Sequence, residues 1–327
     1  MVFYPCVPAP KVITLGLQNP MTYQAGDYKI EVCREFARLC EQHTGGRLVL
    51  KHYYCGDVYP SYRDMTVALM AQEAEVLYVG DSVPEGLGVR EAVIPRTPYF
   101  GVDWDTRVKN HKLIYSDPEA GGKIKSLLRD KGAVHLISTP CAPVVFVINT
   151  KAETEKALGK VKVRTPNVSV YVKVAKAAFL SPTPLAYSEA PMALKTGVVD
   201  GLLTDSQSLV TARFWELGAD HFISNLTPFG AFYAFYVSTT VWDEKLPTDI
   251  REIVENKVMP EIYAWAVDRN RKDLAEGLEI IKENMVIYEI PPSVLKTIKE
   301  RAATTIHPDF EAINPEIFAA MKRICGF

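Results

Sequence analysis

The chain has 327 residues, enough for two domains of ordinary size. It is 48% hydrophobic and 23% charged, a composition typical of a globular protein, which excludes a disordered or low-complexity chain. Because 37 Lys and Arg residues are balanced by 39 Asp and Glu residues, no excess of positive charge is available to neutralise the phosphates of a nucleic acid. The longest apolar runs are too short to cross a bilayer.

Strand and helix patterns alternate in the first part of the chain, after a proline-rich, extended lead-in at Met1–Pro10. The two glycines Gly45 and Gly46 predict a helix end. The order of patterns predicts a parallel or mixed sheet with helices on both faces. The expected strands cover residues 11–17, 47–54 and 75–80, and the expected helices cover residues 26–44 and 61–72.

The alternation then repeats, so we expect a second α/β unit with a changeover near residues 140–145. Residues 248–284 are helical in composition, and Pro260 lies inside this stretch. A proline there predicts either one long kinked helix or two helices that meet. The expected strands of the second unit cover residues 133–138, 144–149, 161–164, 198–203 and 230–238, and the expected helices cover 168–179, 188–196 and 207–215.

Signatures of common enzyme classes are absent: the chain has no GxSxG, HExxH, GxGxxG or Walker A motif. The six histidines lack the spacing of metal ligands, and the cysteines form no CxxC pair. Cys33 and Cys40 lie seven residues apart on one face of an expected helix and are predicted to be buried apolar residues. We therefore expect no metal, no cofactor and no catalytic activity.

The segment Lys160–Pro166 (KVKVRTP) is the strongest candidate for a binding function. Its alternation puts Val161 and Val163 on one face of a strand and Lys162 and Arg164 on the other. An arginine at a strand end can present its planar guanidinium to a carboxylate through two charge-assisted hydrogen bonds. The alternative is a solvated surface arginine.

A series of short segments follows the first expected strand and helix in a fixed order. The segments are Thr44–Leu50 (TGGRLVL), residues 56–74, Pro98-Tyr-Phe with Trp104, residues 145–149 (VFVIN), residues 162–166 (KVRTP) and residues 193–201 (ALKTGVVDG). In this order, from Lys11 to about Asn284, the chain resembles the substrate-binding proteins of TRAP transporters, the DctP-like family. The segment at residues 193–201 is similar to the family signature AL.tG.VDG.

The resemblance implies a two-lobed, periplasmic-binding-protein-like α/β fold, in which helices flank mixed sheets and a long kinked helix crosses both lobes. Lobe I would comprise residues 11–141 plus 229–269, and lobe II residues 142–228 plus 270–327, with the ligand cleft between them. It also implies a periplasmic receptor, formed after removal of a signal peptide that is absent from this chain. Such a receptor would close on a small organic acid and deliver it to the membrane subunits of a TRAP transporter.

The family's carboxylate-clamping arginine falls on Arg164, and its asparagine partner falls on Thr204, which can still donate one hydrogen bond. Asp205 would either accept from a ligand ammonium group or cap the helix that follows it. Aromatic residues would hold the body of the ligand, although core packing is an alternative for each of them. The expected wall residues are Tyr99, Trp104, Tyr187, Phe229 and Tyr233, with Phe100, Trp215 and Phe232 as further candidates.

The expected ligand is a small monocarboxylate that carries an aromatic or apolar body or an amino group. The residues after VDG read Leu202-Leu203-Thr204 where the family usually has Gln-Glu-Asn, which makes a C4-dicarboxylate or a sugar acid less expected. Two other functions stay open at this point: a ligand-sensing receptor for a signalling partner, and an α/β enzyme that acts on a carboxylic acid.

Overall fold

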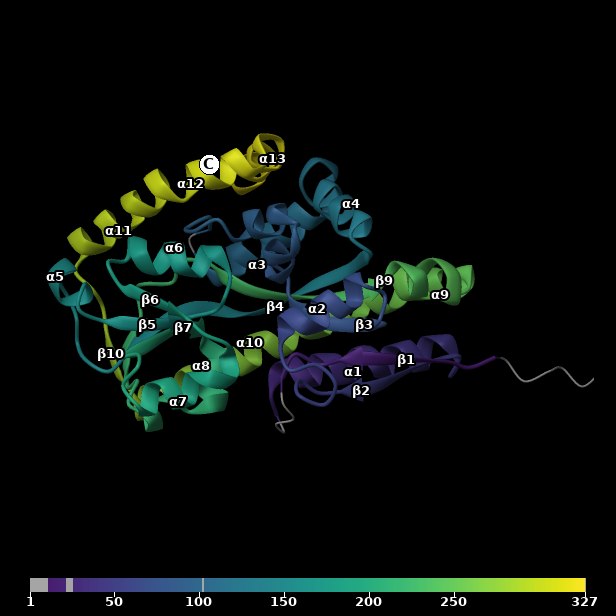
Figure 1. Cartoon of the computed structure of the whole chain (residues 1–327), viewed down its shortest axis with the longest axis horizontal. Helices are drawn as coiled ribbons and strands as arrows, with labels where there is room; N and C mark the ends of the chain where they lie inside the picture. The colour runs from purple at the N-terminus through teal and green to yellow at the C-terminus, as the bar shows by residue number, and fades with distance from the viewer. Residues whose placement is uncertain (1–10, 22–25, 102, 327) are drawn as a thin grey trace, which may run out of the picture.

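The computed structural model describes residues 11–21, 26–101 and 103–326, so the lead-in predicted for residues 1–10 lies outside the described residues. In this described part, ten strands form one mixed sheet in the order β2-β1-β3-β9-β4-β7-β5-β6, with β8 and β10 beside one end of β4. Helices lie above and below the sheet (Figure 1). The two-lobed α/β fold predicted from the sequence is confirmed.

The first lobe contains the strands predicted in the first part of the chain. They begin or end within two residues of the predicted bounds, and β1 pairs in parallel with both β2 and β3. β9, the aromatic strand predicted at residues 230–238, joins this lobe antiparallel to β3. The elements are β1 (Ile13–Gln18), β2 (Leu48–Tyr53), β3 (Val76–Gly80), β9 (Gly230–Ser238), α1 (Tyr28–Thr44), α2 (Tyr62–Met70), η1 (Val83–Leu87), η2 (Arg90–Arg96), α3 (Trp104–Ser116), η3 (Pro118–Gly122) and α4 (Lys123–Asp130).

Helix α1 ends at the residue before Gly45, as predicted, and begins two residues after its predicted start. The Asp27 carboxylate accepts hydrogen bonds from the backbone N–H groups of Lys29 and Ile30, which would otherwise lack partners at the helix start. Gly45 adopts a left-handed conformation with φ 62° and ends the helix. The cysteines predicted to be buried, Cys33 and Cys40, are buried and free.

The second lobe is built around three short strands. β5 lies between β6 and β7 and is parallel to both. The small strands β8 and β10, which the sequence analysis missed, extend the sheet beside β4. The elements are β5 (Lys162–Thr165), β6 (Ser181–Pro184), β7 (Gly201–Asp205), β8 (His221–Ile223), β10 (Val286–Tyr288), α5 (Glu155–Leu158), α6 (Ser169–Ala177), η4 (Tyr187–Glu189), α7 (Ala190–Lys195), α8 (Ser206–Ala212) and η5 (Phe214–Leu217).

One long strand, β4 (Ala133–Ile148), belongs to both lobes. Its first part pairs with β9, and residues 144–148 pair with β7 and β8. The prediction of two separate strands, at residues 133–138 and 144–149, is wrong, because one strand continues through Pro140 and Pro143. The ladder accommodates these prolines with a register shift between Pro140 and Ala142.

The helical stretch predicted for residues 248–284 is continuous. It consists of α9 (Thr248–Ile253), a π-helical turn η7 (Val254–Val258) and α10 (Met259–Asn284). Pro260 is the second residue of α10, directly after the π-helical turn, where its missing N–H disturbs the hydrogen-bond ladder. α10 contacts α1 in the first lobe and α8 in the second, so it crosses both (Figure 1).

Three further helices return across the molecule along the upper side of Figure 1. α11 packs on α6, and α13 packs on α3 and η3, so the C-terminal helices contact both lobes. The residue bounds proposed for the two lobes stay a prediction. The helices are α11 (Pro292–Thr305), α12 (His307–Ile313) and α13 (Pro315–Cys325).

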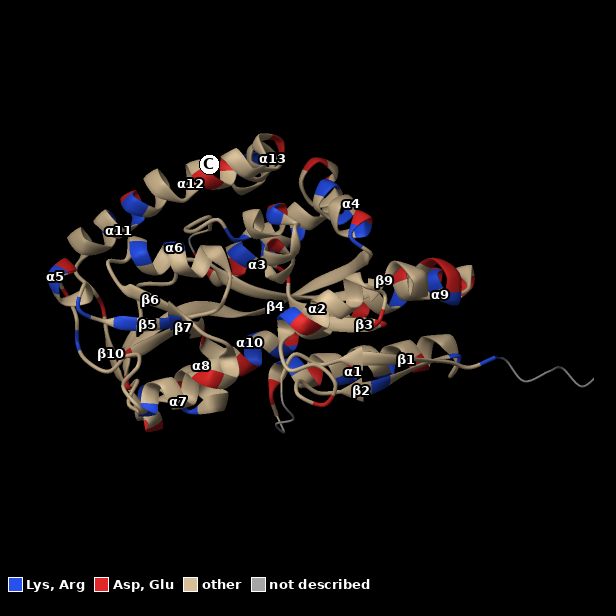
Figure 2. Ribbon diagram, viewed as in Figure 1, with Lys and Arg blue, Asp and Glu red and all other residues tan. Residues whose placement is uncertain are grey.

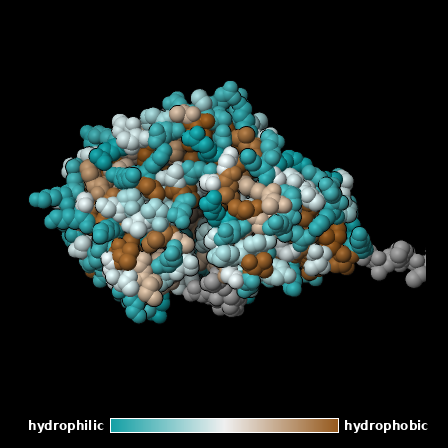
Figure 3. Space-filling view, viewed as in Figure 1, coloured by the Kyte–Doolittle hydropathy of each residue, from teal (hydrophilic) through white to brown (hydrophobic). Residues whose placement is uncertain are grey.

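Charge is concentrated away from the centre of the sheet. Figure 2 shows β4 and β9 without any Lys, Arg, Asp or Glu, whereas charged side chains mark the outer helices. The face in Figure 3 is mostly hydrophilic, with hydrophobic residues in scattered patches. Because the interior is apolar, each buried charged side chain requires an explanation.

Gly201 gives a test of how closely β7 approaches β4. A Cβ added at Gly201 would lie 2.2 Å from the backbone oxygen of Val147, an atom that cannot rotate away. Gly201→Ala should therefore lower the free energy of unfolding by roughly 1–3 kcal/mol, measured by urea denaturation. The matched control is Gly86→Ala, where an added Cβ meets nothing within 4 Å. Equal effects of the two substitutions would contradict this account of the strand packing.

Candidate functional site

Arg164 is buried in the second lobe. It lies on β5, opposite Thr183 of β6 and Leu202 of β7, and its side chain is 3% exposed. Its neighbour Lys162 is exposed, so the burial is specific to the arginine. The signature residue Asp200 fixes the start of this strand, because its carboxylate accepts a hydrogen bond from the Lys162 backbone N–H at 2.8 Å.

The Arg164 guanidinium has few partners within the protein. Its Nε donates to the backbone oxygen of Leu185 at 3.0 Å, and its Cζ lies 5.7 Å from the centre of the Tyr187 ring. Within residues 11–21, 26–101 and 103–326, it forms no ion pair, and its terminal nitrogens make no hydrogen bond. Burial lowers the pKa of Arg164, because no nearby carboxylate stabilises the charge.

A second buried arginine shows the opposite situation. Arg96, on η2, lies 2.6 Å from the Asp81 carboxylate and donates to the Tyr171 hydroxyl of α6 at 2.7 Å. Asp81 also lies 2.6 Å from Nε2 of His111. Burial by itself would raise the pKa of Asp81, but Arg96 and His111 outweigh that effect and lower it. The charge of Arg96 is thus neutralised inside the protein, and its bond to Tyr171 joins the two lobes.

Lys29 and Asp205 form a third buried charged group, again between the lobes. Lys29 of α1 is fully buried, and its Nζ lies 3.6 Å from the Asp205 carboxylate. The same Nζ donates to the Ser208 hydroxyl at 3.1 Å. Burial would raise the pKa of Asp205, but Lys29 and the hydrogen bonds from Ser208 outweigh it, so the pKa is lowered. This pair carries no net charge.

The structure gives Asp205 the second of its two predicted roles. Its carboxylate accepts from the Ser208 backbone N–H at 2.8 Å and from the Ser208 hydroxyl at 2.7 Å, which caps α8. Because Lys29 supplies the positive charge beside it, the carboxylate already has an ionic partner. A contact between Asp205 and a ligand stays a prediction.

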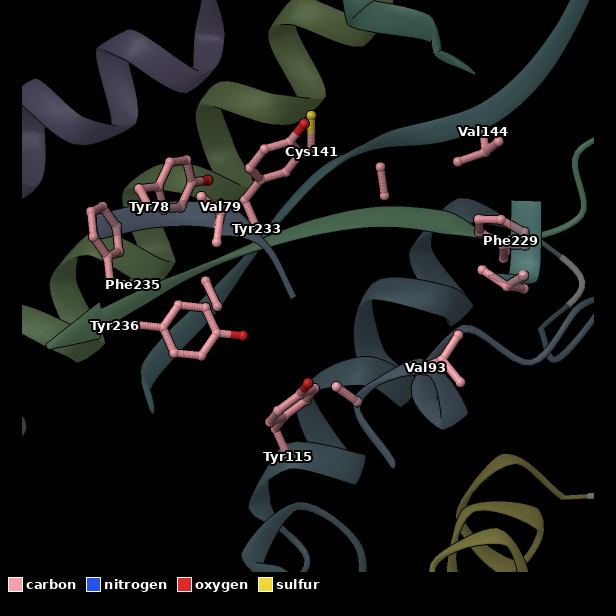
Figure 4. Packing of buried hydrophobic residues seen from close by; sticks show 14 of the residues in the cluster. Tyr78, Val79, Val93, Tyr115, Cys141, Val144, Phe229, Tyr233, Phe235 and Tyr236 are labelled. Carbon is pink, nitrogen blue, oxygen red and sulfur yellow. The ribbon is translucent and has the colours of Figure 1, made fainter. Parts of the chain in front are cut away.

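Several of the predicted wall residues gather near these charges. Tyr187 lies under Arg164, and the Tyr233 ring lies 5.7 Å from Nζ of Lys29. Figure 4 shows Tyr233 of β9 beside Cys141 of β4. Phe229 meets the Tyr171 ring edge-on, with 5.0 Å between the ring centres.

Other predicted site residues have contacts of a different kind. Thr204 is buried on β7, paired with Val145 of β4. Trp104 donates its indole N–H to Asn270 of α10 at 2.9 Å and stacks on Phe232. The Tyr99 ring lies under the Nζ of Lys299. The contacts of Trp104 and Tyr99 are therefore separate from those of Arg164.

Sequence reasoning missed four residues near Arg164 or its charged neighbours: Lys29, Tyr62, Arg96 and Tyr171. Tyr62 and Tyr171 are among the groups whose electrostatic interaction with Arg164 opposes the lowering of its pKa. Lys29 did carry a signal, because a basic residue in the first turn of a helix opposes the helix dipole and calls for an acidic partner. Arg96 and Tyr171 lie in no recognisable motif.

The described residues include no group of three or more His, Cys, Asp or Glu side chains that could hold a metal ion. None of the described helices is both long and apolar enough to span a bilayer. A cavity of about 430 Å³ lies between α8 and α10, and its lining includes Gln207 and Arg269 but not Arg164. The guanidinium instead lies over the Tyr187 ring, and Tyr62, Tyr171 and Tyr233 interact with it electrostatically.

Residues 21–312 match the family model DctP, described as "Bacterial extracellular solute-binding protein, family 7". The chain is 27% identical, over 296 residues, to the C4-dicarboxylate-binding periplasmic protein DctP of Rhodobacter capsulatus. The aligned region covers 88% of this chain and 84% of that protein.

Solved structures show the same fold. One is a marine metagenome TRAP solute binding protein specific for pyroglutamate, and another is the sugar acid binding protein DctPAm from Advenella mimigardefordensis in complex with galactonate. Each has a TM-score of 0.85 and 18% identity, and covers 97% of this chain and 99% of its own. The family match spans most of the chain, and the fold agrees with it. The chain belongs to the DctP family of bacterial extracellular solute-binding proteins.

Proposed function

We propose that this protein is the periplasmic receptor of a TRAP-type transporter and binds a small organic monocarboxylate between its lobes. The observation that carries the proposal is the burial of Arg164 without an acidic partner. The receptor would pass its ligand to the transporter's membrane subunits. The family's description as solute-binding proteins favours this role over an enzyme or a sensor for a signalling partner.

The physical argument starts from the energy of burying a charge. An ionised group removed from water is strongly destabilised unless an opposite charge or hydrogen bonds replace the lost hydration. Nε of Arg164 has one acceptor, the Leu185 oxygen, which leaves the two terminal nitrogens for a ligand. Two parallel N–H donors match the two oxygens of a carboxylate.

The balance of buried charges supports a ligand with one carboxylate. Arg96 is neutralised by Asp81, and Lys29 by Asp205. Of these three basic residues, Arg164 is the one that forms no ion pair with a carboxylate among the described residues. Pyroglutamate and galactonate, the ligands named for two structural relatives, each carry one carboxylate.

The aromatic residues would hold the body of the ligand. Tyr187, Phe229 and Tyr233 would form apolar walls, with Thr204 as a hydrogen-bond donor, and Trp104 and Tyr99 would lie farther from the carboxylate. Lys29–Asp205 and Arg96–Tyr171 join the lobes around this site. A ligand that contacts both lobes binds the closed state more tightly than the open state, so binding favours closure.

Binding should depend on Arg164. Arg164→Met should weaken the affinity for monocarboxylates by roughly 30-fold or more, because it removes the charge-assisted bonds to the ligand. Isothermal titration calorimetry against a library of small acids measures this. The control is Arg213→Met, since Arg213 is exposed and pairs with Glu216. A library ligand that binds wild type and Arg164→Met equally well would refute the anchor.

The two buried arginines should differ in their effect on stability. In ligand-free protein, Arg96→Met should lower the free energy of unfolding by about 3–5 kcal/mol, because the buried Asp81 carboxylate loses its arginine and keeps only the hydrogen bond to His111. Arg164→Met should change it little or raise it, since it removes a desolvated charge. Urea unfolding of both variants checks this. Similar losses in both would mean that Arg164 has an internal role.

The Lys29–Asp205 pair should set the preference between one and two carboxylates. Asp205→Asn keeps a side chain that can cap α8 but leaves the Lys29 ammonium without a carboxylate. The ratio of dicarboxylate to monocarboxylate affinity should then rise by about tenfold. Asp220→Asn is the control, because Asp220 pairs with His221 at the half-exposed start of β8. An unchanged ratio of the two affinities in Asp205→Asn would show that the Lys29–Asp205 ion pair does not influence which acid binds.

A further inference from the structure

A second cavity lies in the first lobe. It has a volume of about 370 Å³ and is bounded by α3, the beginning of β4, η7 and the first turns of α10. Its lining includes Lys112, Tyr115, Lys125, His135, Glu255 and Tyr263, and not Arg164. The cavity is therefore separate from the proposed carboxylate site.

Two buried polar groups lie in the lining. Tyr115 is 6% exposed and His135 is 7% exposed. Nδ1 of His135 has no hydrogen-bond partner, and the Tyr115 hydroxyl interacts with the Ser138 side chain. Figure 4 shows the Tyr115 side chain rising from α3 with its hydroxyl toward the sheet. An unpaired buried polar atom is destabilising, and its presence beside a cavity indicates that a polar molecule satisfies it.

Both groups can donate hydrogen bonds. The two rings stack, with 4.7 Å between their centres. Burial lowers the pKa of His135 to about 3, so its ring is neutral at pH 7. Nε2 of His135 lies 2.8 Å from the Ser138 hydroxyl. When Ser138 donates to Nε2, the ring proton is on Nδ1, which is the unpaired atom.

The charge of the lining favours an anion. Nζ of Lys125 donates to the Tyr115 backbone oxygen at 2.9 Å, and Nζ of Lys112 lies 4.6 Å from the centre of the Tyr263 ring. Neither lysine forms an ion pair within the described ranges, and burial lowers the pKa of Lys125. Glu255 is the acidic residue of the lining, so two ammonium groups exceed one carboxylate.

We propose that this cavity is a second binding site, specific for a small oxyanion such as phosphate or a short carboxylate. The Lys125 ammonium would pair with the anion, and Lys112 would attract it at the exposed rim. The Tyr115 hydroxyl and Nδ1 of His135 would donate to its oxygens.

The test uses the full chain with inorganic phosphate and, separately, acetate as probes. Calorimetry measures the affinity of wild type, Lys125→Met, Tyr115→Phe and Arg164→Met. Lys125→Met should weaken binding of the preferred probe by roughly tenfold or more, and Tyr115→Phe should weaken it by a smaller factor. Arg164→Met should bind phosphate as wild type does, because its side chain is outside this cavity. Acetate is also a monocarboxylate, so its binding to this cavity is measured in the Arg164→Met background, with Lys125→Met added as the test. The nitrogen NMR resonances of the His135 ring should shift when the probe is added to wild type.

The probes also identify the class of anion. Stronger binding of phosphate supports a tetrahedral oxyanion, and stronger binding of acetate supports a carboxylate. The proposal is overturned if wild type binds neither probe at millimolar concentration. It is also overturned if Arg164→Met abolishes the binding and Lys125→Met does not, because the probe then occupies the other site. If Arg164→Met loses the binding of larger organic acids but keeps the binding of phosphate, the second site is supported.

Discussion

The interaction on which the proposed site depends is the burial of the Arg164 charge without an acidic partner. Arg164 is buried near tyrosine side chains with a single backbone acceptor, whereas Arg96 and Lys29 each have a carboxylate within 4 Å. Burial without compensation destabilises the ligand-free protein, and an anion that enters the site removes that penalty. If Arg164 is the carboxylate anchor proposed above, the group that weakens the empty protein is also the group that selects the ligand.

The other buried charges organise the protein around this site. Asp81 holds Arg96 and His111, and Arg96 reaches Tyr171 of the second lobe. Lys29 reaches Asp205 from the first lobe. Each group is neutral as a whole, so the lobes are held together by polar contacts without adding charge to the binding region. In the proposed receptor, the paired residues would hold the lobes together and Arg164 would set the preference for a carboxylate.

Much of the fold could be predicted from periodicity, because α1 and the strands of the first lobe have clear caps and apolar patterns. The strand β4 was predicted as two, since Pro140 and Pro143 lack an N–H and normally interrupt a ladder. Strand alternation and a family resemblance both pointed to Arg164, and the structure shows that it is buried; its role in ligand binding stays a prediction. Arg96, Tyr62 and Tyr171 were not found, because the contacts that give them a role join segments far apart in the sequence. Periodicity describes only neighbours along the chain, so it cannot show such contacts.

The continuity of β4 limits how the two lobes can move. A single strand carries the ladder of both lobes, and its register shift at Pro140 and Ala142 is the place where backbone pairing is already interrupted. There the Asn270 side chain of α10 donates to the Cys141 backbone oxygen, and the Tyr28 hydroxyl lies 2.5 Å from the Pro140 oxygen. Any opening of the lobes would therefore have to bend β4 itself, because no flexible linker replaces the strand at this point. The resistance of β4 to bending would then depend on these few backbone positions. Substitutions there could change how long a ligand stays bound without changing a residue that contacts it.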